Sequence, residues 1–377
     1  MIIFNSLTLF LVFAFIFPVS IFGIRLHDFF LLPIFLLIPF FLKKIKIKNN
    51  LNSVFLSLLF SSFLFVFCFS MYNGFDNANL KSQENNAFNA LKWLIIDRNI
   101  NDFFSSGDYY RNTLIYLRYI LFPFYFTLGY LFFLGGKKSF ELLFGCFLFS
   151  GTLHLIICIF DFISVGGRQS GMFNNPAELS IVALLIFIFS FYDEMVKRKY
   201  IGIFISISLL IFSFTFSSFI ALVSFFFINR INFYKVRVLY ILIIVTSYLL
   251  SLDISSLLSS ALAKYLYVGS LLNRFNLWSV LNDIFSEDTS LYFFSLGSFP
   301  VFTDNVFWYL ISGLGIGGVL FFMYIFYISH RNKYISSIVL VVMVQGMLFP
   351  GFIMPYFIGL LFFLLGFFYY RGDVCEI

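Results

Sequence analysis

The sequence predicts an all-α, polytopic integral membrane protein with about twelve transmembrane helices. The 377 residues are 61% hydrophobic and only 11% charged, whereas soluble domains carry about 25% charged residues. Apolar runs long enough to cross a bilayer as helices recur from one end of the chain to the other. Most Lys and Arg lie in short segments between these runs, which is typical of cytoplasmic loops and not of a nucleic-acid-binding surface.

The first three spans are predicted from apolar length and one strong charge signal. Ile2–Phe22 has neither a basic start nor a clear small-residue cleavage motif, so we interpret it as a retained span and not as a signal peptide. The second span, Phe29–Leu42, ends at four lysines between residues 43 and 48, which places that loop in the cytoplasm. After a third span at about residues 53–72, the polar segment 73–112 is the first long external loop.

Spans four to six follow the same charge rule. The fourth, at about residues 113–134, is followed by Lys137 and Lys138 on the inside. The fifth covers about residues 140–165 and leads into an external turn, 166–176. The sixth ends near residue 192, just before the basic residues Lys197, Arg198 and Lys199.

The stretch Tyr200–Ile231 is interpreted as two short spans. A single helix of this length would be about 45 Å long, too long for an untilted span. One crossing would also leave Arg230, Lys235 and Arg237 outside. A polar turn near Ser213–Ser218 divides the stretch and restores the charge rule.

The remaining spans complete a single membrane domain over residues 1–377. The ninth span is at about residues 238–252, so 253–303 becomes a large external loop between the ninth and tenth spans. The tenth span begins near Asn305, and the twelfth ends before Arg371. Both termini are therefore predicted to be cytoplasmic.

The external turn around Arg168 is the first candidate site. Only Arg168 and Arg25 occupy short external loops, because the other Lys and Arg lie inside or in and next to the two long loops. Three glycines permit tight bends here, and Pro176 suits the first turn of the next helix. A guanidinium near a helix N-terminus favours an anion such as phosphate. The alternative is an ordinary polar turn whose arginine reaches lipid head groups.

The large external loop supplies two more candidates. Arg274 and Trp278 are four residues apart and share a helical face, where a guanidinium and an aromatic ring suit a phosphate beside a sugar. The alternative is a surface helix with Trp278 as an interfacial anchor. Asp304 and Asn305 stand at the outer mouth of the tenth span, where they either cap that helix or face a polar cavity.

No residue pattern indicates a metal or nucleotide site. The four Cys and three His are scattered, and the sequence contains no zinc spacing, P-loop or hydrolase serine motif. The predicted cytoplasmic loops are too short for a nucleotide-binding portion. Any group donor must therefore be carried by lipid or reach the protein from the external side.

Together these segments resemble the O-antigen polymerase and O-antigen ligase superfamily of Gram-negative inner membranes. Residues 168–176 (RQSGMFNNP) are similar to the family's Arg–Gly–Phe–Asn–Pro turn. Arg274 with Trp278 is similar to the Arg–Trp pair of its large periplasmic loop. Residues 297–305, followed by Gly313 and Gly317, are similar to the segment that closes this loop and enters the next span. The resemblance covers about residues 166–318.

Two departures from the family pattern refine the resemblance. Ser217 and Ser218 stand where the family often has a Ser-Arg pair, so that anion contact is absent or supplied from elsewhere. Asp304 and Asn305 stand where ligases usually have His-Asn. The second departure favours a polymerase over a ligase.

The resemblance implies a periplasmic-face glycosyltransferase that polymerises O-antigen repeat units carried on undecaprenyl pyrophosphate, without a metal or other cofactor. It implies catalytic roles for Arg168 and Arg274 on the pyrophosphate and for Asp304 on the acceptor hydroxyl. It implies substrate binding by Asn175, Trp278 and Asn305. The implied partners are the lipid-linked oligosaccharide, membrane lipid, a chain-length regulator and the flippase, and not nucleic acid.

Two other functions share this topology. An O-antigen ligase would transfer the same glycan to lipid A-core. A lipid-linked oligosaccharide flippase would be expected to carry inverted repeats and charges deep in its spans. No repeat is evident, and the main charges within spans, Arg118 and Asp161, fit positions near the outer interface.

Overall fold

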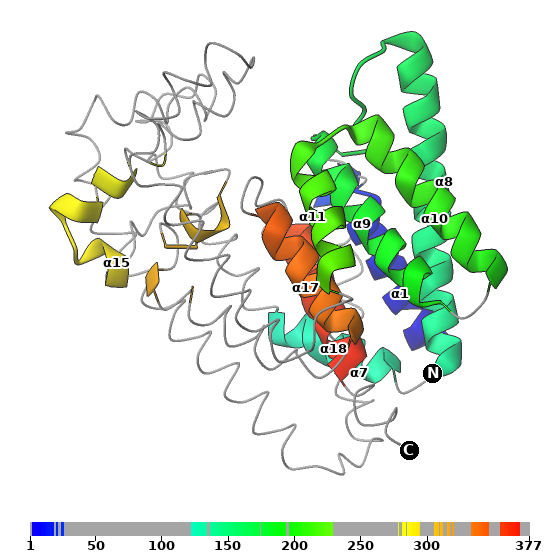
Figure 1. The fold of residues 1–377 in the computed structure, drawn as a ribbon. Coiled ribbons are helices and arrows are strands. Elements are labelled where there is room, and N and C mark those ends of the chain that lie inside the picture. Colours follow the sequence, from blue (N-terminus) through cyan, green and yellow to red (C-terminus); the bar gives the residue numbers. More distant parts are fainter. Residues whose placement is uncertain are drawn as a thin grey trace.

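Figure 1 shows the fold of the chain in a computed structural model. The structure describes residues 2–18, 20–21, 24–25, 122–133, 136–173, 175–193, 196–228, 278, 281–283, 285–294, 305–308, 310–311, 315–316, 319, 333–346 and 355–369. Within them the regular structure is α-helix, apart from one antiparallel pair of two-residue strands, β1 (Ser20–Ile21) and β2 (Ile24–Arg25). The prediction of an all-α fold is confirmed. The loop 73–112 and most of 253–303 lie outside the described residues.

The helices form a bundle with a short helical segment beside it. The bundle contains α1 (Ile2–Ile16), α7 (Phe122–Phe133), α8 (Lys137–Ser164), α9 (Pro176–Tyr192), α10 (Val196–Ser213), α11 (Phe216–Ile228), α17 (Lys333–Gly346) and α18 (Pro355–Tyr369), and α15 (Leu291–Phe294) lies to its left in Figure 1. Among the described residues, α8, with 28 residues, is the helix long and apolar enough to cross a membrane. The other bundle helices are shorter, and most are strongly apolar.

The first helix is shorter than the predicted span. α1 ends at Ile16, and the following residues form the β1–β2 pair, in which Ser20 lies opposite Arg25. Pro18 accounts for this end, because proline lacks an N–H and disfavours helical geometry at the preceding residue. The carbonyl of Ile16, left without a partner inside the helix, meets the ring of His154 instead.

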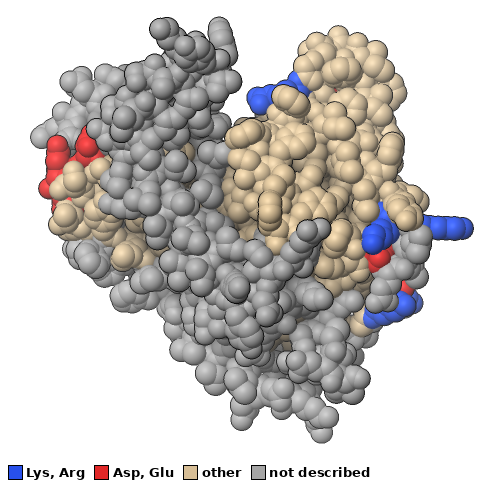
Figure 2. Space-filling model, viewed as in Figure 1, with Lys and Arg blue, Asp and Glu red and all other residues tan. Residues whose placement is uncertain are grey.

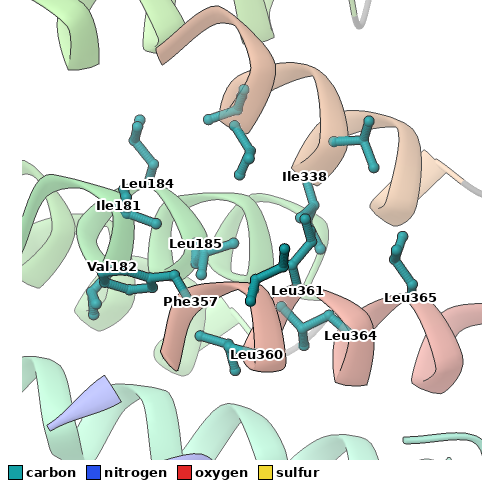
Figure 3. Packing of buried hydrophobic residues seen from close by; sticks show 14 of the residues in the cluster. Ile181, Val182, Leu184, Leu185, Ile338, Phe357, Leu360, Leu361, Leu364 and Leu365 are labelled. Carbon is teal, nitrogen blue, oxygen red and sulfur yellow. The ribbon is translucent and has the colours of Figure 1, made fainter. Parts of the chain in front are cut away.

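Helix α9 forms the centre of the bundle. Every residue from Ala177 to Ser190 is buried, which is typical of a helix covered by neighbours on all sides. Figure 3 shows the α9 side chains meeting those of α17 and α18 in one apolar core. The labelled contributors are Ile181, Val182, Leu184, Leu185, Ile338, Phe357, Leu360, Leu361, Leu364 and Leu365.

The stretch 200–231 contains a helix break where the charge rule predicts one. α10 ends at Ser213, Phe214 has a positive φ of 40°, and α11 begins two residues later. Phe212 near the end of α10 contacts Gln169 in the turn before α9, and Gly202 near the start of α10 lies against Ser190 near the end of α9, so these two helices are antiparallel. α11 runs parallel to α9. Ser180 contacts Ser218 near the starts of the two helices, and Phe187 and Phe191 meet Phe225 further along both. The chain therefore reverses direction at a break that lies within the predicted turn, Ser213–Ser218.

The basic segments lie together at one end of the bundle, which we name the basic end. The starts of α8 and α17 and the ends of α9 and α18 meet there. Tyr334 donates to the carbonyl of Tyr192 at 3.1 Å and stacks on Phe368 with ring centroids 4.8 Å apart. Figure 2 shows Lys and Arg side chains gathered at the lower right, where α8 and α10 begin in Figure 1. The basic residues of these segments are Lys137, Lys138, Lys197, Arg198 and Lys199.

The outer faces of α8, α10 and α11 expose large apolar side chains. On α10 they recur at helical spacing, as at Tyr200, Phe204 and Ile211, and Phe204 is 67% exposed. The opposite face of α10 is buried against α9, so both faces of this helix carry apolar side chains. Figure 2 shows this part of the molecule as a broad uncharged surface. Exposed apolar side chains gathered on one surface are typical of a site that contacts another protein or a membrane.

Candidate functional site: the Arg168 turn

The turn between α8 and α9, residues 166–175, is a folded structure and not a loose connection. Gly166, Gly167 and Gly171 have φ values of 72°, 78° and 57°, which other residues rarely adopt. The buried side chain of Gln169 donates to the carbonyls of Gly166 and Gly167 at 3.0 and 3.2 Å. Its backbone N–H donates to the carbonyl of Phe212 at the end of α10. The glycine bends predicted from sequence are therefore present and fixed to the bundle.

Arg168 lies between two residues whose backbone positions are fixed, the bent Gly167 and the hydrogen-bonded Gln169. Gly167 precedes it and Gln169 follows it, yet Arg168 itself is exposed. It forms no hydrogen bond or ion pair within the part of the chain that the structure describes. The turn therefore holds the backbone of Arg168 in place and leaves its guanidinium available to a ligand.

Helix α9 begins at the far side of the same turn. The side-chain oxygen of Asn175 accepts a hydrogen bond from the backbone N–H of Ala177 at 2.9 Å, and Pro176 occupies the first helical position. Glu178 lies in the first turn, where a negative charge is favourable. Asn175 thus caps the helix with its oxygen. Arg168 and Asn175 are the sequence-predicted residues that this turn brings together.

His154 of α8 lies behind the turn and fixes it to the bundle. The backbone N–H of Met172 donates to Nδ1 at 3.3 Å, so Nδ1 carries no hydrogen. Nε2 then carries the hydrogen of a neutral ring and donates it to the carbonyl of Ile16, 2.9 Å away. Phe173 stacks on the ring with centroids 5.0 Å apart, and a Cβ on Gly171 would come within 2.6 Å of Nδ1.

We expect His154→Asn to keep the Arg168 turn in place and His154→Gln and His154→Phe to loosen it. The Asn oxygen branches from Cγ as Nδ1 does and can accept from Met172, whereas Phe offers no acceptor and Gln places its polar atoms near Nε2. Loss of a buried hydrogen bond costs about 1–3 kcal/mol, so amide exchange at Met172 should quicken roughly tenfold or more. Hydrogen–deuterium exchange of the purified protein measures this. Equal rates in all three variants would contradict the role of His154.

A cluster of buried polar side chains joins the starts of α9 and α11 to the end of α17. We name Ser180, Thr215, Ser218 and Gln345 the Gln345 cluster. The Ser218 oxygen lies 2.5 Å from the oxygens of both Ser180 and Thr215. Nε2 of Gln345 donates to Ser180 at 2.8 Å and to the carbonyl of Ala177 at 3.1 Å. Two parallel helices, α9 and α11, therefore begin side by side next to the Arg168 turn.

A second group of predicted residues comes from the large loop and the helix after it. Trp278 is fully buried, and Leu281 and Phe285 share its face of the helical segment. Its indole has no exposed surface for a sugar to stack on in this conformation. The side-chain oxygen of Asn305 accepts from the backbone N–H groups of Phe307 and Trp308, as the capping interpretation predicts. Phe285 lies against the Trp308 ring with centroids 5.5 Å apart, which joins loop and helix.

Arg274 and Asp304 lie outside the described residues, so their roles stay predictions. Sequence reasoning did not single out His154 or Gln345. The signal that indicates them is a polar side chain within an otherwise apolar helix. Within the described residues, no group of three His, Cys, Asp or Glu side chains is placed to hold a metal ion.

Comparison with known proteins assigns no family to this chain. No family model, curated protein or solved structure matches it.

Proposed function

We propose that the chain is a multi-pass protein of the bacterial inner membrane, with about twelve spans and its basic end in the cytoplasm. The exposed apolar faces of α8, α10 and α11 support this, because lipid tails would cover them without a further partner. The gathering of Lys and Arg at one end supports the orientation, with both termini on the cytoplasmic side. The Arg168 turn lies at the opposite end of α8 and would then face the periplasm.

The function that this site supports best is that of a glycosyltransferase at the periplasmic face, an O-antigen polymerase. One observation carries it: an exposed guanidinium, Arg168, extends from a fixed glycine bend in the turn that leads into α9. This arrangement suits a pyrophosphate, because guanidinium groups and helix N-termini both favour anions. Ser218 is engaged in the Gln345 cluster, so a second anion contact comes from elsewhere, and Arg274 is the candidate.

The proposed reaction joins two lipid-linked glycans. A hydroxyl oxygen at the non-reducing end of a new repeat unit attacks the anomeric carbon of the growing glycan, and the bond from that carbon to pyrophosphate oxygen breaks. Undecaprenyl pyrophosphate leaves with the bonding electrons, and Arg168 and Arg274 stabilise the charge that develops on it. The hydroxyl proton passes to Asp304 or to water. Holding both substrates by their lipids removes much of the entropic cost of bringing them together.

A gene deletion distinguishes this function from its rivals. Loss of a polymerase is expected to give lipopolysaccharide capped with a single repeat unit, whereas loss of a ligase or a flippase gives none. Gel electrophoresis of lipopolysaccharide from the deletion strain and from a strain complemented with the full chain measures the outcome. Core without any repeat unit in the deletion strain would rule out the polymerase.

A further inference from the structure

Every hydroxyl hydrogen in the Gln345 cluster already has an acceptor. Ser180 donates to the carbonyl of Ala177 at 2.7 Å, and Ser218 donates to Ser180. Because the hydroxyl hydrogen of Ser218 is already donated to Ser180, Thr215 must be the donor in the hydrogen bond between Thr215 and Ser218. The amide hydrogens of Gln345 are directed to Ala177 and to the serine oxygens. The cluster is therefore a chain of hydroxyl groups with no hydrogen to spare.

One acceptor in this cluster remains without a donor. The Oε1 atom of Gln345 is buried and accepts no hydrogen bond from any residue that the structure describes, and the residue is 1% exposed. Exchanging the amide oxygen and nitrogen of Gln345 would not give Oε1 a donor. The oxygen would then face the carbonyl oxygen of Ala177, which is itself an acceptor. Buried polar atoms are normally satisfied, so Oε1 indicates a place for a molecule that donates a hydrogen bond.

The surroundings of Oε1 select a neutral donor. A carboxylate or a fully ionised phosphate has no hydrogen to give. A cation is disfavoured, because α9 and α11 both begin at this cluster and direct the positive ends of their dipoles toward it. A neutral hydroxyl group meets both conditions.

We propose that the Gln345 cluster binds a neutral hydroxyl group, which donates a hydrogen bond to Oε1 of Gln345. The hydroxyl belongs to a buried water molecule or to a sugar of the lipid-linked glycan, and the second source rests on the proposed function. Gln345 is 1% exposed, so a water molecule fits the closed cluster, whereas a sugar hydroxyl reaches Oε1 only when the starts of α9 and α11 part from the end of α17. Gln345 would thus link the bound hydroxyl to the starts of α9 and α11.

Cryo-electron microscopy of the full chain in lipid nanodiscs, at a resolution that shows ordered water, tests this directly. The two samples are the protein alone and the protein with the undecaprenyl-pyrophosphate-linked repeat unit. Density at hydrogen-bond distance from Oε1 in both samples identifies water, and density that appears with the repeat unit identifies a sugar hydroxyl. An Oε1 atom that accepts from a protein donor, or that has no density beside it in either sample, overturns the proposal.

The variant Gln345→Met gives a second test that does not require a structure. It keeps the length of the side chain and removes both the acceptor and the Nε2 donor, and Ser180→Ala is the control that removes a partner of Nε2 and leaves Oε1 intact. If water is bound, Gln345→Met lowers the thermal unfolding midpoint more than Ser180→Ala does, with KM unchanged. If a sugar is bound, KM for the repeat unit rises about tenfold in Gln345→Met alone. Equal midpoints and equal KM values in the two variants overturn the proposal, and the midpoint is informative even if the protein has another activity.

Discussion

Replacing Arg168 with alanine is expected to reduce polymer formation about 100- to 1,000-fold. Removal of one group that stabilises developing negative charge costs roughly that factor in turnover. Arg168 makes no hydrogen bond or ion pair within the described residues, so the bundle should fold as before. Arg168→Lys should retain only part of the activity, because an ammonium cannot contact two phosphate oxygens in the fixed geometry of a guanidinium.

The measurement is the length and amount of O-antigen made by cells in which each variant replaces the original protein at equal abundance. Lys197→Ala is the matched control, since Lys197 is also exposed and cationic but lies at the basic end. It should leave the polymer unchanged. Polymer of normal length and amount from Arg168→Ala would remove Arg168 from the proposed site, and the same test applies to Arg274→Ala.

Replacing Gly129 with alanine is expected to destabilise the bundle by about 3 kcal/mol, at the upper end of the usual cost of forcing extra atoms into a packed interior. A Cβ at Gly129 of α7 would overlap the backbone carbonyl of Phe363 in α18. A Cβ at Gly366 of α18 would in turn overlap the carbonyl of Phe126 in α7. The two backbones therefore touch, as is typical of membrane helices that pack through small residues. Neither helix can move away without disturbing the core.

Gly145→Ala is the matched control for this prediction. Gly145 also lies inside a helix, but no heavy atom stands within 4 Å of its Cβ position. The intrinsic gain from replacing a helical glycine is about 1 kcal/mol, so this variant should be as stable as the original protein or more so. The thermal unfolding midpoint and the yield of folded protein measure both variants. Similar midpoints for Gly129→Ala and Gly145→Ala would show that α7 and α18 are not in backbone contact.

Some tertiary features could be anticipated because a single segment contains their cause. The helix break between α10 and α11 follows from the length of the stretch and from the basic residues beyond it, and Phe214 has the strained backbone of such a break. Gly166, Gly167 and Gly171 indicate the bends of the Arg168 turn. Asn305 marks a helix start by its own chemistry, because its side chain satisfies N–H groups two and three residues later.

Other features could not be anticipated, because they depend on how distant helices pack. His154 reaches Ile16 across 138 positions of the chain, and Gln345 reaches Ser180 across 165. Either side chain alone is only a polar residue in an apolar helix. Its partner is set by the rotation and height of another helix, which composition and spacing do not encode locally.

The sequence by itself determined the helical class, the division of the stretch 200–231, the gathering of basic segments and the position of the Arg168 turn. Each of these follows from hydropathy, charge or backbone preference within a short segment. Tertiary structure alone decided that His154 holds this turn, that α9 and α11 begin side by side, and that Gln345 joins them. The physical reason is that hydrogen bonds and close packing are made between segments far apart in the chain, and only the assembled bundle fixes which groups meet.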